Sequence, residues 1–222
     1  MWRDAALVAG RDLRVELRSR VTVNQVAPFA LLVLVLFAFA LDPDRQLLER
    51  VASGLFWTAV LFSALLAIAR SAAIDETDGV RDALRLSGLD PAGVFVGKAA
   101  AVAAELLVLE VLLGVGVVVL YGADPTGVGL LVLASVAATA AVAATGTLYG
   151  ALVSGLRVRE TLLPLVLLPV LAPVLIGATR AWEAALEGAP ADGWPWCGLL
   201  AAFAVLYSVA GALAYGTLLE GS

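Results

Sequence analysis

Six long apolar runs separated by short polar connections constrain the fold of this chain more than any other feature. Their approximate limits are 24–41, 51–69, 99–121, 127–153, 161–178 and 197–219. A run of about 20 apolar residues matches the roughly 30 Å hydrocarbon core of a bilayer. The runs lack the strict alternation of a membrane β-barrel, and helices satisfy their own backbone in lipid. The sequence therefore predicts an all-α integral membrane protein with six transmembrane helices.

The composition leaves room for one membrane domain over 1–222 and for no large soluble domain. Hydrophobic residues make up 62% of the chain, and the net charge of −5 gives no reason to expect a nucleic-acid partner. Histidine is absent, which removes the commonest metal ligand and the commonest general base near neutral pH. The single cysteine, Cys197, cannot form an internal disulfide. We therefore expect no metal site and no catalytic residue.

Positive charge is distributed unevenly between the connections. The N-terminal tail, the connection between spans 2 and 3, and the connection between spans 4 and 5 hold eleven of the fourteen Lys and Arg residues. Connections rich in Lys and Arg stay on the cytoplasmic side. This bias predicts a multi-pass membrane protein with both termini in the cytoplasm.

The segment that precedes the first span, 1–23, is amphipathic. Within WRDAALVAGRDLRVELRSR, the apolar positions are supplied by Leu7, Val8, Leu13, Val15 and Leu17. This pattern favours a helix lying in the membrane interface. A simpler interpretation, compatible with the first, is a positively charged topology signal.

The connection 70–98 contains the stretch DETDGVRDALRLSGLDP. Thr77 or Asp78 can cap a helix of about nine residues that begins near Gly79, with Gly88 just beyond its end. Asp90 can then cap a second helix with Pro91 at its first position, running through to the third span. A helix of about nine residues is not stable alone in water, so it requires support.

Two short motifs in this region resemble nucleotide-binding sequences. LSGL is close to the signature of ABC ATPases, and GVFVGK is close to a phosphate-binding P-loop. A P-loop needs four residues between its glycines and a hydroxyl after its lysine. Here Gly93 and Gly97 enclose three residues, and Ala99 follows Lys98. ATP hydrolysis by this chain is therefore not expected.

Two carboxyl groups and three prolines fall inside the spans. Glu105 and Glu110 lie roughly 140° apart around a helix, so they do not form one paired site. A polar path, a subunit contact or a buried structural hydrogen bond would each explain them. In the fifth span, Pro164, Pro169 and Pro173 each remove a backbone hydrogen bond and are predicted to kink the helix.

The segment 179–196, TRAWEAALEGAPADGWPW, lies between the last two spans. We expect AWEAALE to form a short amphipathic helix at the outer interface. Tryptophans at positions 182, 194 and 196 suit that location, because indole rings favour the headgroup region.

The chain resembles the CcmB family, the permease subunit of the ABC complex for cytochrome c maturation. The resemblance covers nearly the whole chain, and the stretches that carry it are RDLRVELRSR, GLFWTAVLFSALLAIAR, DETDGVRDALRL and LLPVLAPVLIGA. It implies an ABC-2-type permease architecture and a location in the bacterial cytoplasmic (inner) membrane. It also implies an assembly of two permeases with two copies of a separate ATPase, CcmA, which binds ATP and magnesium.

The same resemblance implies further partners and a role for the connection 70–98. The implied partners are the haem-handling membrane protein CcmC, the small protein CcmD and the haem chaperone CcmE. Membrane lipid is a further partner. The complex would handle haem, and no cofactor is expected on this chain. The short helix would dock on the ATPase; the residues implied in coupling are Asp75, Glu76, Asp78, Gly79, Val80, Leu84 and Leu86.

ATP hydrolysis in the partner would drive haem delivery or export, or release of the haem-loaded chaperone. Three alternatives remain open from the sequence: an ABC-2-type permease that exports a lipid, drug or polysaccharide, an intramembrane enzyme, and a structural scaffold. An enzyme would need a convergent set of polar groups, which Glu105 and Glu110 do not supply.

Overall fold

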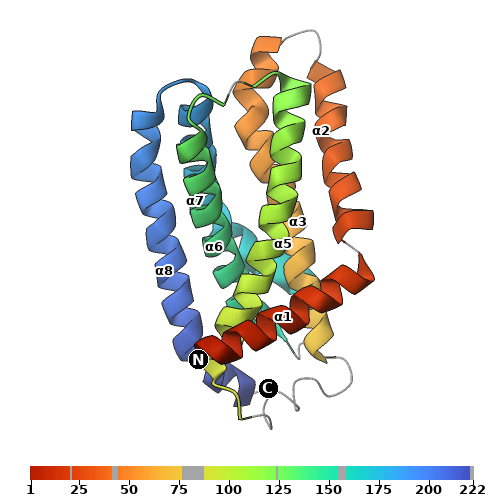
Figure 1. The fold of residues 1–222 in the computed structure, drawn as a ribbon, viewed down its shortest axis with the longest axis vertical. Coiled ribbons are helices and arrows are strands. Elements are labelled where there is room, and N and C mark those ends of the chain that lie inside the picture. Colours follow the sequence, from red (N-terminus) through yellow and green to blue (C-terminus); the bar gives the residue numbers. More distant parts are fainter. Residues whose placement is uncertain (21, 42–44, 77–87, 124, 155–158, 221–222) are drawn as a thin grey trace.

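The computed structural model is a bundle of long helices with one further helix lying across one end (Figure 1). It describes residues 1–222 apart from 21, 42–44, 77–87, 124, 155–158 and 221–222. In chain order the helical elements are α1 (Trp2–Ser19), the π-helix η1 (Thr22–Val26), α2 (Ala27–Leu41), α3 (Arg45–Glu76), α5 (Pro91–Tyr121), α6 (Val128–Val153), α7 (Arg159–Leu186) and α8 (Pro190–Glu220).

Six helices in the described part of the chain are long and apolar enough to cross a bilayer. They are Asn24–Leu41, Leu47–Ala73, Pro91–Tyr121, Val128–Val153, Thr161–Leu186 and Pro190–Leu218. The predicted all-α, six-span fold is thus confirmed. Helix α1 and the end of α8 lie at one end of the bundle, called the α1 end below; the opposite end is called the far end (Figure 1).

Several helices extend beyond the apolar runs from which they were predicted. Helix α3 continues to Glu76 and α5 begins at Pro91, so much of the connection 70–98 is helical. Helix α8 begins at Pro190 instead of residue 197. Charged residues such as Arg70 and Lys98 end the apolar runs without ending the helices, because their charges find partners on α1.

The main hydrophobic core contains side chains from α2, α3, α5, α6, α7 and α8. Its far half holds an aromatic group: Phe56 stacks on Trp182 with ring centroids 3.8 Å apart, and Trp57 packs edge-on against Phe56. A second, smaller cluster at the α1 end joins Val8 of α1 to Phe95 and Tyr215. Helix α1 packs against α5 here.

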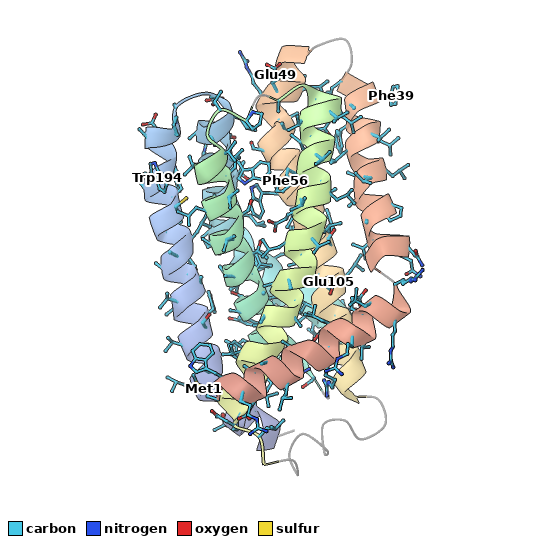
Figure 2. All side chains as sticks on the ribbon, viewed as in Figure 1. Met1, Phe39, Glu49, Phe56, Glu105 and Trp194 are labelled. Atoms are coloured by element: carbon cyan, nitrogen blue, oxygen red, sulfur yellow. The ribbon has the colours of Figure 1, made fainter. Side chains whose placement is uncertain are left out.

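The predicted interfacial helix AWEAALE is wrong as a separate element. Helix α7 continues without a break through these residues to Leu186. Trp182 is buried in the aromatic group, and its indole Nε1 donates a hydrogen bond to Ser135 Oγ at 3.2 Å. Trp194 is exposed near the start of α8, as an interfacial residue would be (Figure 2).

The three prolines lie inside α7, which stays one helix around all of them. The predicted bends at Pro164, Pro169 and Pro173 stay predictions, because a continuous helix is compatible with either a straight or a bent axis. Helix α7 packs against α6, α8 and α3.

Candidate functional site

The residues predicted to couple the chain to an ATPase fall largely outside the described part of the structure. Asp75 and Glu76 belong to the last turn of α3, and their side chains are not described. The remaining five lie in the segment 77–87: Asp78, Gly79, Val80, Leu84 and Leu86. The structure does describe the two helices between which this segment runs.

Helix α5 begins at Pro91, shortly after this segment, and its first turn is capped by Asp90. Asp90 has an extended backbone, and its carboxylate accepts a hydrogen bond from the Ala92 N–H at 3.1 Å. Pro91 occupies the first turn, where its missing N–H has no helical acceptor. Gly88 has a φ of 67°, which glycine adopts without steric cost. The predicted cap at Asp90 and Pro91 is confirmed.

Helix α1 is joined by ion pairs to the helices on both sides of segment 77–87. Lys98 Nζ of α5 lies 3.4 Å from Asp12 Oδ2, with the Lys98 side chain only 3% exposed. Arg70 Nη1 of α3 lies 2.7 Å from Glu16 Oε2, and Arg70 also donates to Ser19 Oγ. Any movement of α3 and α5 at this end therefore acts on α1.

Close backbone packing reinforces this contact between α1 and α5. An ideal Cβ built on Gly97 would lie 2.6 Å from the carbonyl oxygen of Ala5 and 2.8 Å from Val8 Cβ. At Gly93 the nearest atom would be the Met1 carbonyl oxygen at 2.7 Å. The stretch GVFVG is therefore a helix-crossing motif in which small residues let two backbones approach. This packing explains the two glycines that resemble part of a P-loop.

The beginnings of α1 and α5 also meet through charged groups. The Met1 amine lies 3.2 Å from Asp4 Oδ2 and 3.5 Å from Asp90 Oδ2. Hydrogen bonding from this amine, followed by that from the Asp90 backbone N–H, holds the pKa of Asp4 below its ordinary value. Asp4 thus stays ionised and links the two helix starts.

Glu105 lies on α5 at the edge of the α1 contact (Figure 2). It borders a hollow of about 30 Å³ that is also lined by Asp12, Glu16, Arg70 and Ser71. Glu105 is therefore part of the same charged neighbourhood as the ion pairs to α1. It is separate from Glu110, as the helical spacing indicates.

Glu110 is buried between α5 and α6, with 5% of its surface exposed. Thr139 Oγ1 of α6 donates a hydrogen bond to Glu110 Oε1. The other carboxyl oxygen, Oε2, has no partner among the described residues. This geometry fits a buried structural hydrogen bond between two spans, which is one of the interpretations left open by the sequence.

A structural role predicts different tolerances at the two ends of this hydrogen bond. Replacing Glu110 with glutamine keeps an acceptor for Thr139, so the loss of stability should be no more than about 1 kcal/mol. The thermal midpoint in mild detergent measures this loss. Thr139→Val removes the donor and should lower stability by about 1–3 kcal/mol. Thr145→Val, which changes a hydroxyl bonded to Ala141 O within its own helix, is the control. A Glu110→Gln protein less stable than Thr139→Val would contradict this role.

The acidic face of α1 was missed by the sequence reasoning. Asp4, Asp12 and Glu16 recur at multiples of four residues, so they share one side of the helix, and this side faces the bundle. Trp2, Leu7 and Leu17 are instead exposed on the outside. The spacing of the acids was the available signal, and it indicates contact with basic residues on neighbouring helices.

In the described residues, no group of three or more His, Cys, Asp or Glu side chains could hold a metal ion. Cys197 is buried near the start of α8 as a free thiol. The arrangement therefore offers mechanical contacts and one buried carboxyl group. Together with six spans and a helix across one end, it defines a polytopic helical membrane protein.

Comparisons with known proteins identify the family within this class. The family model described as "CcmB protein" matches residues 4–221. Heme exporter protein B of Escherichia coli is 34% identical over 203 residues, covering 82% of this chain and 83% of its own. The protein of the same name from Haemophilus influenzae is 32% identical over 183 residues, with 82% and 83% covered.

A third relative extends the match further along the chain. Heme exporter protein B of Bradyrhizobium diazoefficiens is 30% identical over 208 residues, covering 92% of this chain and 91% of its own. The chain belongs to the CcmB family. The resemblance noted in the sequence is therefore confirmed, and the protein is a membrane-embedded transporter subunit related to haem exporters.

Proposed function

We propose that this chain is the permease subunit of an ABC-type complex that handles haem during cytochrome c maturation. The names of its relatives, heme exporter protein B, support haem as the substrate. Two copies of this chain would pair with two copies of a separate ATPase that holds ATP and magnesium. CcmC-, CcmD- and CcmE-like proteins would complete the assembly, with ATP hydrolysis driving haem delivery or export, or release of the loaded chaperone.

The proposed docking site for the ATPase is the segment 77–87 together with the last turn of α3. The observation that carries this assignment is the linkage of α1 to the helices that bracket the segment. Arg70 of α3 contacts Glu16, and Lys98 of α5 contacts Asp12. A force applied between α3 and α5 would therefore move α1 relative to the bundle. The two ion pairs supply the mechanical connection that coupling requires.

The proposed orientation places the α1 end in the cytoplasm, where an ATPase has access to ATP. The tail and connections that hold eleven of the fourteen Lys and Arg residues join helices at this end. The positive-inside rule supports the assignment. The far end, with the connections 122–127 and 187–189, would then face the periplasm.

Haem would be handled by this subunit without an axial ligand from histidine, since the chain has none. Its only methionine is Met1, and Cys197 is buried in the core cluster. Axial ligands of haem are ordinarily His, Met, Cys or Tyr. The purified subunit, free of tags and partners, should show no bis-histidine haem spectrum, and such a spectrum would contradict this assignment.

The coupling assignment predicts that a double variant will lose the ATPase. Leu84→Asp puts a charge where an apolar contact is proposed, and Asp78→Arg inverts a negative charge beside it. Recovery of the co-expressed ATPase with the permease should therefore fall about tenfold or more. Permease-stimulated ATP hydrolysis should fall with it. Asp192→Arg, at the exposed start of α8, makes the same charge change at the far end and should leave both unchanged. Intact assembly with full ATP hydrolysis would refute the docking site.

A further inference from the structure

A groove in the far half of the bundle runs between α3 and α7 and plays no part in the proposed coupling. It has a volume of about 330 Å³, at the lower end of the range for small-molecule sites. The residues that line it lie along one face of each helix. The α3 side is formed by Gly54, Trp57, Thr58 and Leu61, and the α7 side by Leu175, Ile176, Thr179, Arg180 and Glu183.

The polarity of the groove changes along its length. The end of the groove nearer the middle of the bundle is apolar. It is lined by Leu61 of α3 and by Leu175 and Ile176 of α7. Toward the far end the lining becomes polar, with Arg180 and Glu183 in the last turns of α7. Such a lining fits a molecule with an apolar body and one polar end.

Trp57 supplies an unused hydrogen-bond donor at the wall of this groove. Its side chain is 1% exposed, and its indole Nε1 has no hydrogen-bond partner among the described residues. By contrast, the neighbouring indole of Trp182 donates to Ser135 Oγ. A buried N–H at membrane depth is costly to leave without an acceptor. An acceptor atom on a bound molecule would remove this cost.

Arg180 supplies a second donor, and this one is charged. Its side chain is 60% exposed, and Nη1 donates to Glu183 Oε2 at 2.9 Å, three residues further along the helix. A guanidinium group has five N–H donors in a planar fork that matches a carboxylate or phosphate. The contact with Glu183 orients this fork at the polar end of the groove.

Gly54 keeps the groove open. An ideal Cβ built on Gly54 would meet no heavy atom within 4 Å, so the missing side chain leaves accessible space on the α3 side. Thr58 and Ile176 on the two walls are exposed on the outside of the bundle. A ligand could therefore enter sideways from the surrounding lipid without passing through the core.

We propose that the α3–α7 groove binds an amphiphile by its carboxylate or phosphate group, with Arg180 holding the anionic end and Trp57 Nε1 donating to an acceptor atom beside the apolar wall. Two sources share this chemistry: the headgroup of an anionic phospholipid, and a propionate of haem. The haem source rests on the proposed function, whereas the lipid source does not. Either ligand would be held at the far end, away from the segment proposed to meet the ATPase.

The test compares groove variants with matched controls in the intact chain. Gly54→Leu places a side chain in the groove from a Cβ position that meets no heavy atom within 4 Å, and Arg180→Gln removes the charge. Gly114→Leu, on α5, also meets no heavy atom within 4 Å at its Cβ and lies outside the groove. Arg50→Gln removes an exposed arginine from the same half of α3. The wild-type protein and all four variants are purified and reconstituted into phosphatidylcholine nanodiscs.

Two probes distinguish the ligand sources. Iron protoporphyrin IX and its dimethyl ester are titrated while tryptophan fluorescence quenching is recorded, and retention of phosphatidylglycerol is measured by native mass spectrometry. We expect Gly54→Leu and Arg180→Gln to weaken binding of one probe about tenfold or more, with both controls unchanged. Preference for the free acid over the dimethyl ester identifies propionate, and loss of phosphatidylglycerol identifies the lipid.

The proposal is overturned if the wild-type protein binds neither probe, or if the groove variants bind like the controls. Loss of binding in all four variants alike would also overturn it, because the effect would then not belong to the groove. The readouts need no ATPase, so a failure of the coupling assignment leaves them unaffected. Conversely, Gly54→Leu should still co-purify with the ATPase if the coupling assignment is correct.

Discussion

Replacing Gly97 with leucine is expected to detach α1 from the bundle and to destabilise the protein by about 3 kcal/mol or more. The new Cβ would lie 2.6 Å from the carbonyl oxygen of Ala5, a backbone atom that cannot rotate away as a side chain can. The rest of the leucine would meet Val8, whose Cβ is 2.8 Å from the same point. Helix α1 must then move outward, which also pulls Asp12 away from Lys98.

Detachment can be measured by limited proteolysis of α1 and by the thermal midpoint of the protein in mild detergent. Gly114→Leu on the same helix is the matched control, because its Cβ would meet no heavy atom within 4 Å. That control also gains helix propensity worth up to about 1 kcal/mol, so any loss in Gly97→Leu is not caused by the leucine itself. Unchanged protease protection and an unchanged midpoint in Gly97→Leu would refute the close crossing.

The six spans could be predicted from the sequence because each apolar run is as long as the hydrocarbon core is thick. The ends of the helices could not, because an apolar run stops at the first charged residue and a helix does not. Arg70 and Lys98 continue their helices with their charges paired to α1. The start of α5 was predictable, since Asp90 and Pro91 form a local cap that depends on no distant contact.

The orientation of α1 could not be predicted from its apolar residues. In water the apolar side of a helix faces the protein core, but beside a bilayer it can face lipid instead. Leu7 and Leu17 are exposed, while the acids Asp12 and Glu16 face basic residues of the bundle. Deciding between the two orientations requires knowing that Arg70 and Lys98 both lie close to α1. Their place beside α1 is a property of the tertiary fold.

Trp182 shows the same limit at the far end. Tryptophan is common at membrane interfaces, and the composition of 179–196 gave no reason to separate Trp182 from Trp194. Trp182 is nevertheless buried, because Phe56 offers a stacking surface and Ser135 accepts from its indole N–H. Both partners come from other helices, α3 and α6, so no local pattern around Trp182 reveals them.

Reversing the charge of Lys98 is the second change with a large expected effect. Lys98 is 3% exposed, so Lys98→Glu would place a second carboxylate beside Asp12 in a poorly hydrated site. Breaking a buried pair by removing one partner costs about 3–5 kcal/mol. The variant should therefore show a lower thermal midpoint and faster cleavage of α1 by protease. If the proposed coupling is correct, it should also lose ATPase stimulation while the ATPase still binds.

A charge exchange separates the pair from a general effect of charge. Combining Lys98→Glu with Asp12→Lys restores opposite charges across the α1–α5 contact and should recover part of the lost stability. Arg14→Glu makes a comparable charge change on the exposed side of α1 and should shift the midpoint little, because exposed charges contribute about 0–1 kcal/mol. If the exchange recovers nothing and Arg14→Glu is equally damaging, the pair does not hold α1. Recovery of both stability and ATPase stimulation would identify the Lys98–Asp12 contact as the connection between the ATPase cycle and α1.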